Sequence, residues 1–190
     1  MEDFRSSDTV VIGVGNTILS DEGVGVHAAR LLESDPRVPA DVTILDGGTL
    51  GLELIPYASD ASRMLILDAM NSGKAPGTLA RMTGKDLLST TAGRSVHQLG
   101  VADLIAALLL VSSGPQEIIV LGVQPANTDW GTTLSPEVEA ALVLLVDAAV
   151  AQLHLWKESR DRGFKFESSA LPPGRHSDRM VSKPCEKGSN

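Results

Sequence analysis

The chain has 190 residues, 43% of them hydrophobic, and a formal net charge of −8 at pH 7. Its length fits one domain, and its apolar content is sufficient to fill one core. The acidic charge and the 3% aromatic content argue against nucleic-acid binding, which needs cationic surface and stacking rings.

The predicted domain covers residues 1–158. The polar stretch 159–190 has little apolar content, so we expect it to be a disordered tail. The single cysteine, Cys185, lies in this tail, which excludes an intrachain disulfide and a cysteine metal cluster. We find no signal peptide and no uncharged apolar segment of about 18 residues. We therefore expect a cytoplasmic protein with no membrane span. We also expect a monomer.

Apolar strands alternate with helical segments along the chain. Alternation of this kind is typical of a mostly parallel sheet covered by helices on both faces. We expect an α/β fold, a three-layer α/β/α sandwich with roughly five strands. The expected elements are strand 9–14, helix 21–33, strand 42–45, helix 50–57, strand 64–68, strand 78–82, helix 98–111, strand 117–123 and helix 136–156.

Two helix starts are marked by capping residues. Ser135 offers an N-cap, followed by Pro136 at the first helical position and an acidic first turn. Ser95 and Gln98 have the spacing of a capping box. These signals support the helices that begin near 136 and 98.

Polar residues follow the apolar strands, at the sheet edge where ligands bind in open α/β folds. The candidates are Glu22, Asp46, Asp68 and His97. Carboxylates together with an imidazole form a mixed oxygen and nitrogen set that can hold a divalent metal. The sequence therefore indicates a candidate site for a divalent metal at this edge.

Each candidate also has a structural interpretation. Glu22 could stabilise the positive end of a helix dipole, and Asp46 begins a Gly-rich turn. Asp68 ends a very apolar strand, so it is either hydrogen-bonded to a loop or directed into a site. His97 near a helix start would stay neutral and able to bind metal, or be a structural histidine. Asp129 and Trp130 could border the cleft, but we expect them to pack within their loop.

Several common sites are not supported. A dinucleotide fingerprint would need glycine where Ile18 stands, and a P-loop would need a hydroxyl where Ala75 follows Lys74. Neither a Gly-x-Ser-x-Gly elbow nor a His-Glu-x-x-His pair occurs. His27 is five residues from Glu22, too far around a helix to share one ion with it.

Six sequence runs resemble the hydrogenase maturation endopeptidases when taken together and in order. They span most of the predicted domain and read GVGNTILSDEGVGVH, ILDGGTLGLELI, LILDA, APGTL, HQLGVADLIAAL and VLGVQP. The resemblance implies the three-layer fold, an aspartic-type endopeptidase, and a nickel site formed by Glu22, Asp68 and His97. It also implies that Asp46 lies near the cleft.

The same resemblance implies the substrate, the large-subunit precursor of a nickel-iron hydrogenase. Nickel would be carried by the precursor, with no organic cofactor, and the protease would remove a short C-terminal peptide. A water activated by Asp46, by Asp68 or by nickel itself could attack the bond. The alternatives are a non-catalytic nickel-binding chaperone and a nucleotide-dependent α/β enzyme.

Overall fold

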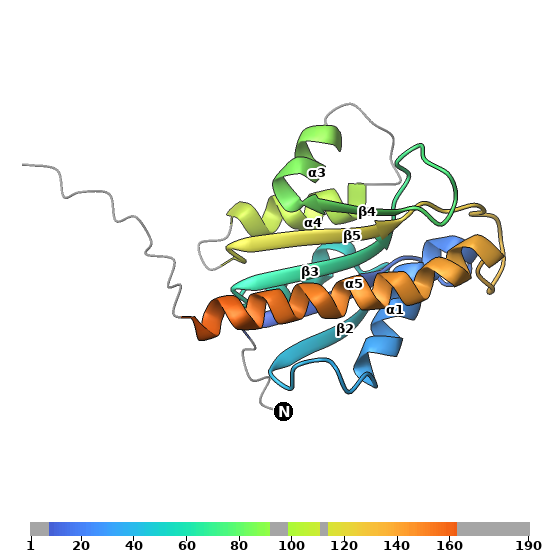
Figure 1. Cartoon of the computed structure of the whole chain (residues 1–190). Helices are drawn as coiled ribbons and strands as arrows, with labels where there is room; N and C mark the ends of the chain where they lie inside the picture. The colour runs from blue at the N-terminus through green and yellow to red at the C-terminus, as the bar shows by residue number, and fades with distance from the viewer. Residues whose placement is uncertain (1–7, 92–98, 111–113, 163–190) are drawn as a thin grey trace, which may run out of the picture.

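The computed structural model describes residues 8–91, 99–110 and 114–162. Five strands form one sheet in the order β2-β1-β3-β5-β4 (Figure 1). They are β1 Thr9–Val14, β2 Val42–Gly48, β3 Arg63–Ala69, β4 Leu79–Thr83 and β5 Glu117–Val123. All neighbouring strands are parallel except β4, which runs antiparallel to β5 at one edge. The expected mostly parallel, five-stranded α/β fold is confirmed.

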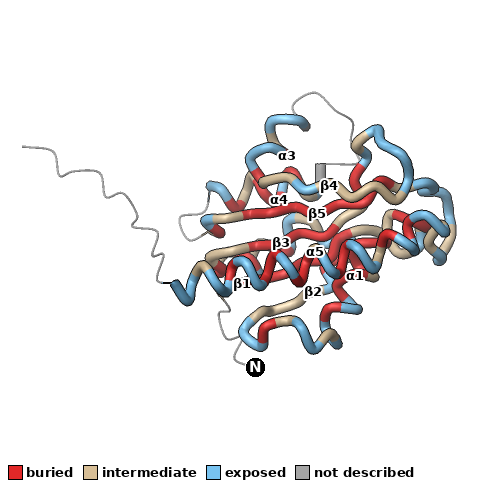
Figure 2. The backbone as a smooth tube through the Cα atoms, in the orientation of Figure 1, coloured by how far each residue is buried: buried red, intermediate tan, exposed pale blue. Residues whose placement is uncertain are grey.

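Helices cover both faces of the sheet. On one face lie α1 Val24–Glu33 and α5 Pro136–Asp161. On the other lie η2 Gly51–Leu54, α2 Ile55–Ala58, α3 Gly84–Thr91 and α4 Leu99–Leu110. The 3-10 helix η1 Ser20–Gly23 precedes α1. Two separate apolar cores result, one on each side of the sheet, which is buried along its middle strands (Figure 2).

Alternation along β3 divides its residues between the two cores. Leu65 and Leu67 pack on the α1 and α5 side, whereas Met64 and Ile66 pack on the α2 and α4 side. Successive side chains of a strand point to opposite faces, so both faces of a central strand must be apolar. By the same alternation Asp68 belongs to the α2 and α4 face.

Most expected elements are present, with small shifts at their ends. The predicted helix 21–33 is a 3-10 turn followed by α1, and β2 continues three residues beyond the expected end. Ser135 caps α5, because its hydroxyl accepts from the Val138 amide at 3.4 Å, and Pro136 opens the helix. The capping box at 95–98 lies outside the described residues.

Helix α3 was not expected from the sequence. Its start carries a capping pair: Thr83 Oγ1 donates to Asp86 Oδ2 at 2.7 Å and accepts from the Asp86 amide at 3.1 Å. Thr83 and Asp86 stand three residues apart, the spacing of a capping box, so the signal was present in the sequence.

Helix α5 extends to Asp161, beyond the expected domain boundary at 158. Within the described parts of the chain it is the single helix long and apolar enough to cross a membrane by length and composition. Its buried residues, among them Leu145, Ala149 and Leu153, pack in the core on one side of the sheet. Packing against the sheet accounts for the apolar composition of α5.

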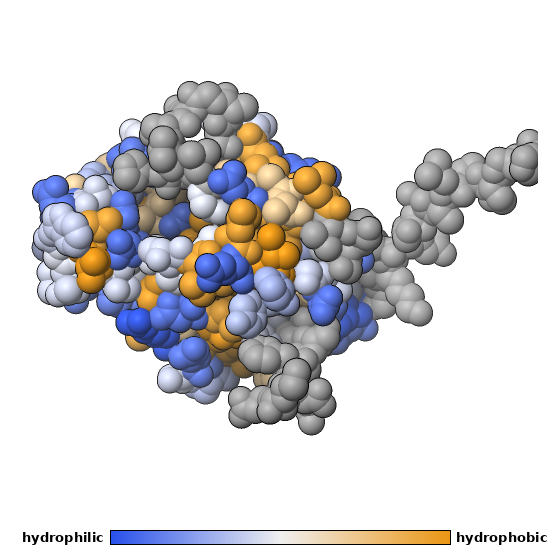
Figure 3. Space-filling view, turned by 180° about the vertical axis from the view of Figure 1, so that it is seen from behind, coloured by the Kyte–Doolittle hydropathy of each residue, from blue (hydrophilic) through white to orange (hydrophobic). Residues whose placement is uncertain are grey.

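The face of the molecule on the side of η2, α2, α3 and α4 carries a central apolar surface bordered by hydrophilic residues (Figure 3). Exposed apolar side chains of this helical layer include Leu52, Tyr57 and Leu110. The layer also contributes Gly51 and Leu54 to a cavity at this face of the sheet. This cavity is the candidate site.

Candidate functional site

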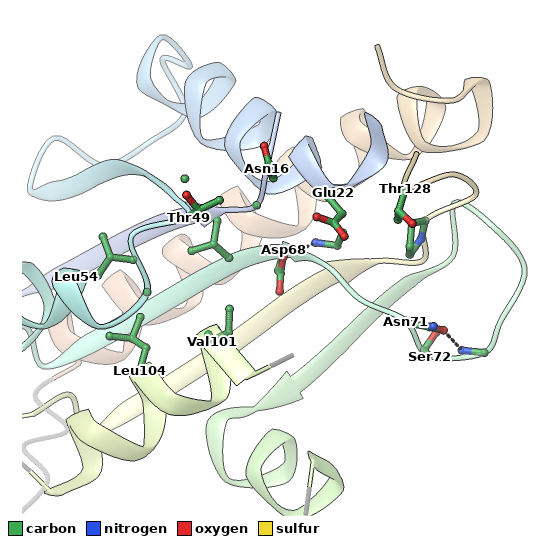
Figure 4. Close-up of a pocket in the computed structure, with 18 residues that line it drawn as sticks. Asn16, Glu22, Thr49, Leu54, Asp68, Asn71, Ser72, Val101, Leu104 and Thr128 are labelled. Carbon is green, nitrogen blue, oxygen red and sulfur yellow. Dashed lines mark hydrogen bonds between the residues drawn. The ribbon is translucent and has the colours of Figure 1, made fainter. Parts of the chain in front are cut away.

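A cavity of about 710 Å³ opens where β1 and β3 end. One side is polar, with Asn16 and Glu22 after β1 and Thr128 after β5. Another side is apolar, formed by Leu54, Val101 and Leu104. Asp68 lies between them, with the carboxylate of Glu22 on one side and Val101 on the other (Figure 4). The cavity is in the position expected for a ligand site in an open α/β sheet.

Asp68 is a partly buried carboxylate at the end of β3. Its Oδ1 accepts a hydrogen bond from the Ala69 amide at 2.7 Å. Burial raises the pKa of Asp68 to about 7, the Ala69 hydrogen bond opposes this rise, and the negative charge of Glu22 adds to it. A carboxyl group that titrates near neutral pH can both give and take a proton under physiological conditions.

Glu22 is positioned by a close backbone approach within the segment that connects β1 to α1. Gly15 follows β1 with a φ of +129°, and any Cβ there would collide with the Glu22 carbonyl oxygen. The Gly15 amide also donates to the Gly48 carbonyl oxygen at 2.9 Å. Only glycine allows this backbone conformation and this contact. Gly15 thereby brings the turn that carries Glu22 against the end of β1.

Asp21, next to Glu22, has a structural role that the sequence analysis did not find. Its side chain is fully buried and accepts four hydrogen bonds, from the amides of Ala126, Asn127 and Ser135 and from the Ser135 hydroxyl. Burial acts to raise the pKa of Asp21, but these hydrogen bonds outweigh it and lower the pKa below 3.8. Asp21 thus fastens the 126–135 segment to η1.

Asp46 is not brought to the cavity. In the sheet Gly13 pairs with Asp46 on one side and with Leu67 on the other, so these residues face the same way. Leu67 packs in the core beneath α1 and α5, on the opposite face from Asp68. Accordingly, Asp46 accepts two hydrogen bonds from Arg30 of α1, at 2.8 and 3.1 Å. The structure places Asp46 in an exposed ion pair rather than in the cavity lining.

The remaining candidates are distributed as follows. Glu22 and Asp68 line one cavity, as expected, whereas His97 lies outside the described residues. Within residues 8–91, 99–110 and 114–162 no three His, Cys, Asp or Glu side chains gather as a metal site.

Asn71 and Ser72, which line the cavity after β3, were not predicted from the sequence. Ser72 is held by Gln124, whose Oε1 accepts from the Ser72 amide at 2.8 Å. The available signal was their position just after an apolar strand, the same signal that identified Asp68.

Comparisons with known proteins agree with this architecture. The model of a protein family described as hydrogenase maturation protease matches residues 26–152. A hydrogenase expression/formation protein, HupD of Rhodobacter capsulatus, is 32% identical over 176 residues, which cover 91% of this chain and 84% of the relative. The hydrogenase 2 maturation protease of Escherichia coli K12 is 36% identical over 146 residues, covering 76% and 89%.

Solved structures show the same relationship. The hydrogenase maturating endopeptidase HybD from E. coli superposes with a TM-score of 0.70 at 33% identity, covering 82% of this chain and 93% of that one. A hydrogenase 2 maturation peptidase from a Thaumarchaeota archaeon gives a TM-score of 0.60 at 30% identity, covering 77% and 98%.

Proposed function

The chain belongs to the hydrogenase maturation protease family, and from this premise we propose that it removes a short C-terminal peptide from the large-subunit precursor of a nickel-iron hydrogenase. The supporting observation is that Glu22 and Asp68 share one cavity at the ends of the strands. Nickel carried by the precursor would be the recognition element.

Glu22 and Asp68 are the proposed oxygen ligands of the substrate's nickel, and His97 is the proposed nitrogen ligand. Nickel accepts both donor types. Three donors from the protease would complete a coordination sphere that the precursor begins. Cleavage would then depend on metal insertion, because the scissile bond is held in place only when nickel is present.

Asp68 is also the proposed general base, which would make the hydrolysis aspartic-type. Its Oδ1 accepts from Ala69, and among the described residues no donor reaches Oδ2. The carboxylate would take a proton from water as the water oxygen bonds to the peptide carbonyl carbon, and return it to the leaving amine as the C–N bond breaks. Asp46 is less well suited to this role because it faces the other side of the sheet.

The test is mass analysis of the precursor after incubation with the protease, in nickel-loaded and nickel-free forms. We expect loss of a short C-terminal peptide from the loaded form alone. Cleavage of both forms would refute the nickel requirement. Nickel-dependent binding without any loss of mass would refute proteolysis and favour the chaperone alternative.

A further inference from the structure

Two loops beside the cavity are joined along their backbones. Leu19 and Gly131 form an isolated parallel bridge, in which the Ser20 amide donates to Gly131 at 2.9 Å and the Gly131 amide donates to Ile18 at 3.0 Å. The Ser20 hydroxyl donates to the Asp129 carbonyl oxygen at 3.0 Å. Together with the four hydrogen bonds to Asp21, these contacts fix both loops in one arrangement.

The joined loops present two large apolar side chains to solvent. Trp130 is 81% exposed and Ile18 is 47% exposed. The other tryptophan of the chain, Trp156, is only 4% exposed and packs in the core. The expectation that Trp130 would pack within its own loop is therefore wrong. An exposed tryptophan on a fixed loop leaves apolar surface available for a partner.

Both apolar residues stand two positions from a residue that lines the cavity. Ile18 follows Asn16, and Trp130 follows Thr128. A polypeptide whose end reaches Asp68 must continue outward past the cavity's border, and these loops supply part of that border. The rigid loops need little ordering on binding, which favours affinity.

Charge indicates what kind of partner fits. The described residues that line the cavity include the acids Glu22 and Asp68 and no Lys, Arg or His. An occupant with a positive centre is therefore complementary to the cavity, and an apolar surface beside that centre is complementary to the loops. Tryptophan is among the residues that contribute most to protein interfaces.

We propose that Ile18 and Trp130 form a docking patch for the body of the protein substrate, the nickel-carrying precursor, next to the point where its C-terminal segment enters the cavity. This inference rests on the proposed function, because it takes the precursor as the occupant. It adds a contact that affects substrate binding rather than the chemical step.

A direct test uses the full-length protease labelled with 5-fluorotryptophan, which gives two fluorine NMR signals that Trp130→Phe assigns. Unlabelled nickel-loaded precursor should shift or broaden the Trp130 signal and leave the Trp156 signal unchanged. No change at Trp130 while the precursor is bound would overturn the proposal. A Trp130 signal that moves with protease concentration alone would overturn it in favour of self-association.

Kinetics give the second test. Trp130→Ala and Ile18→Ala should each raise KM for precursor processing, by about tenfold for Trp130, with kcat within about twofold of wild type. The matched control is Leu155→Ala, which removes a side chain of α5 that is 58% exposed. It should leave KM unchanged.

The docking patch and the proposed proteolysis can be refuted separately. If the wild-type protein cuts the precursor but Trp130→Ala leaves KM unchanged or lowers only kcat, the docking patch is refuted and the proposed function stands. If the wild-type protein does not cut the precursor, the proposed function is refuted.

Discussion

Asp21 and Asp68 are carboxylates withdrawn from solvent at the same edge of the sheet, Asp21 fully and Asp68 partly. They differ in the number of hydrogen-bond donors around them. Asp21 lies at the junction of η1 with the 126–135 segment, where four donors surround it. Asp68 lines the cavity, where the Ala69 amide is its one donor from the described residues. The pKa of Asp21 is lowered, and that of Asp68 is raised to about 7.

The comparison shows that a buried carboxylate can serve either to hold segments of the chain together or to form a reactive site. Hydrogen bonds to Asp21 offset the cost of burying its charge, so the charge fastens two segments that are more than a hundred residues apart in the sequence. At Asp68 one hydrogen bond offsets only part of the cost of burying the negative charge, so the ionised form is destabilised. Asp68 is therefore suited to exchange a proton or to bind a cation. Glu22 lies directly beside Asp21 in the sequence, so the fastened segment also fixes one wall of the cavity.

The largest effect that separates the two residues should be on activity. Asp68→Asn keeps the shape of the side chain and removes its charge, so processing of the precursor should fall by about 10²- to 10⁴-fold. The melting temperature should not fall, because no set of hydrogen bonds is lost. The control is Asp103→Asn on the exposed face of α4, which should process at the wild-type rate. A processing rate near wild type for Asp68→Asn would show that the charge of Asp68 is not needed for cleavage.

Asp21→Asn should act on stability. The amide would place a donor opposite the backbone donors of the 126–135 segment and leave buried groups unsatisfied. We expect a loss of about 2–4 kcal/mol in the free energy of unfolding and a melting temperature lower by about 2–4 °C per kcal/mol. Urea denaturation and calorimetry measure both quantities. An unchanged melting temperature would show that the segment is held by other contacts.

The pH dependence of stability should have opposite signs for the two residues. Because the pKa of Asp68 is raised to about 7 in the folded protein, the stability it contributes is fully present below pH 3.8 and is lost as the pH rises towards 7. Asp21 has a lowered pKa, so its contribution is present above pH 3.8 and is lost as the pH falls further.

Urea titrations across this range measure the effect. The gain in stability of Asp68→Asn over wild type should grow between pH 4 and 7, whereas the deficit of Asp21→Asn should shrink below pH 3.8. A gain for Asp68→Asn that does not change with pH would contradict the account of Asp68.

The smallest effect is expected at a third carboxylate, Asp46. Its partner Arg30 has a side chain that is 55% exposed, and exposed ion pairs contribute little. Arg30→Ala should change the free energy of unfolding by less than about 1 kcal/mol. A loss as large as that of Asp21→Asn would show that the Asp46 pair also fastens the fold.

The mostly parallel sheet and most of its strands could be predicted from the sequence because each central strand is apolar on both faces. The position of Asp68 at the end of such a strand was likewise visible. The face on which Asp46 lies was not, because it depends on the pairing of Gly13 with both Asp46 and Leu67. Strand alternation fixes the faces within one strand, whereas the relation between strands comes from their register.

The role of Asp21 was hidden for a different reason. Its partners Ala126, Asn127 and Ser135 are brought to it by the fold, and no local pattern near Asp21 indicates them. The exposure of Trp130 was missed similarly, because it follows from a backbone bridge between two distant loops. Helix α3 is the exception, since its capping pair was present in the sequence.

Whether Asp68 carries out the cleavage can be tested by intact-mass measurement of nickel-loaded precursor incubated with wild-type protease, Asp68→Asn or Asp21→Asn, at a temperature where all three remain folded. We expect a shortened precursor with the wild-type protein, cutting slower by about 10²- to 10⁴-fold with Asp68→Asn, and measurable cutting with Asp21→Asn. Cutting by Asp68→Asn at the wild-type rate would contradict the assignment of the site to Asp68.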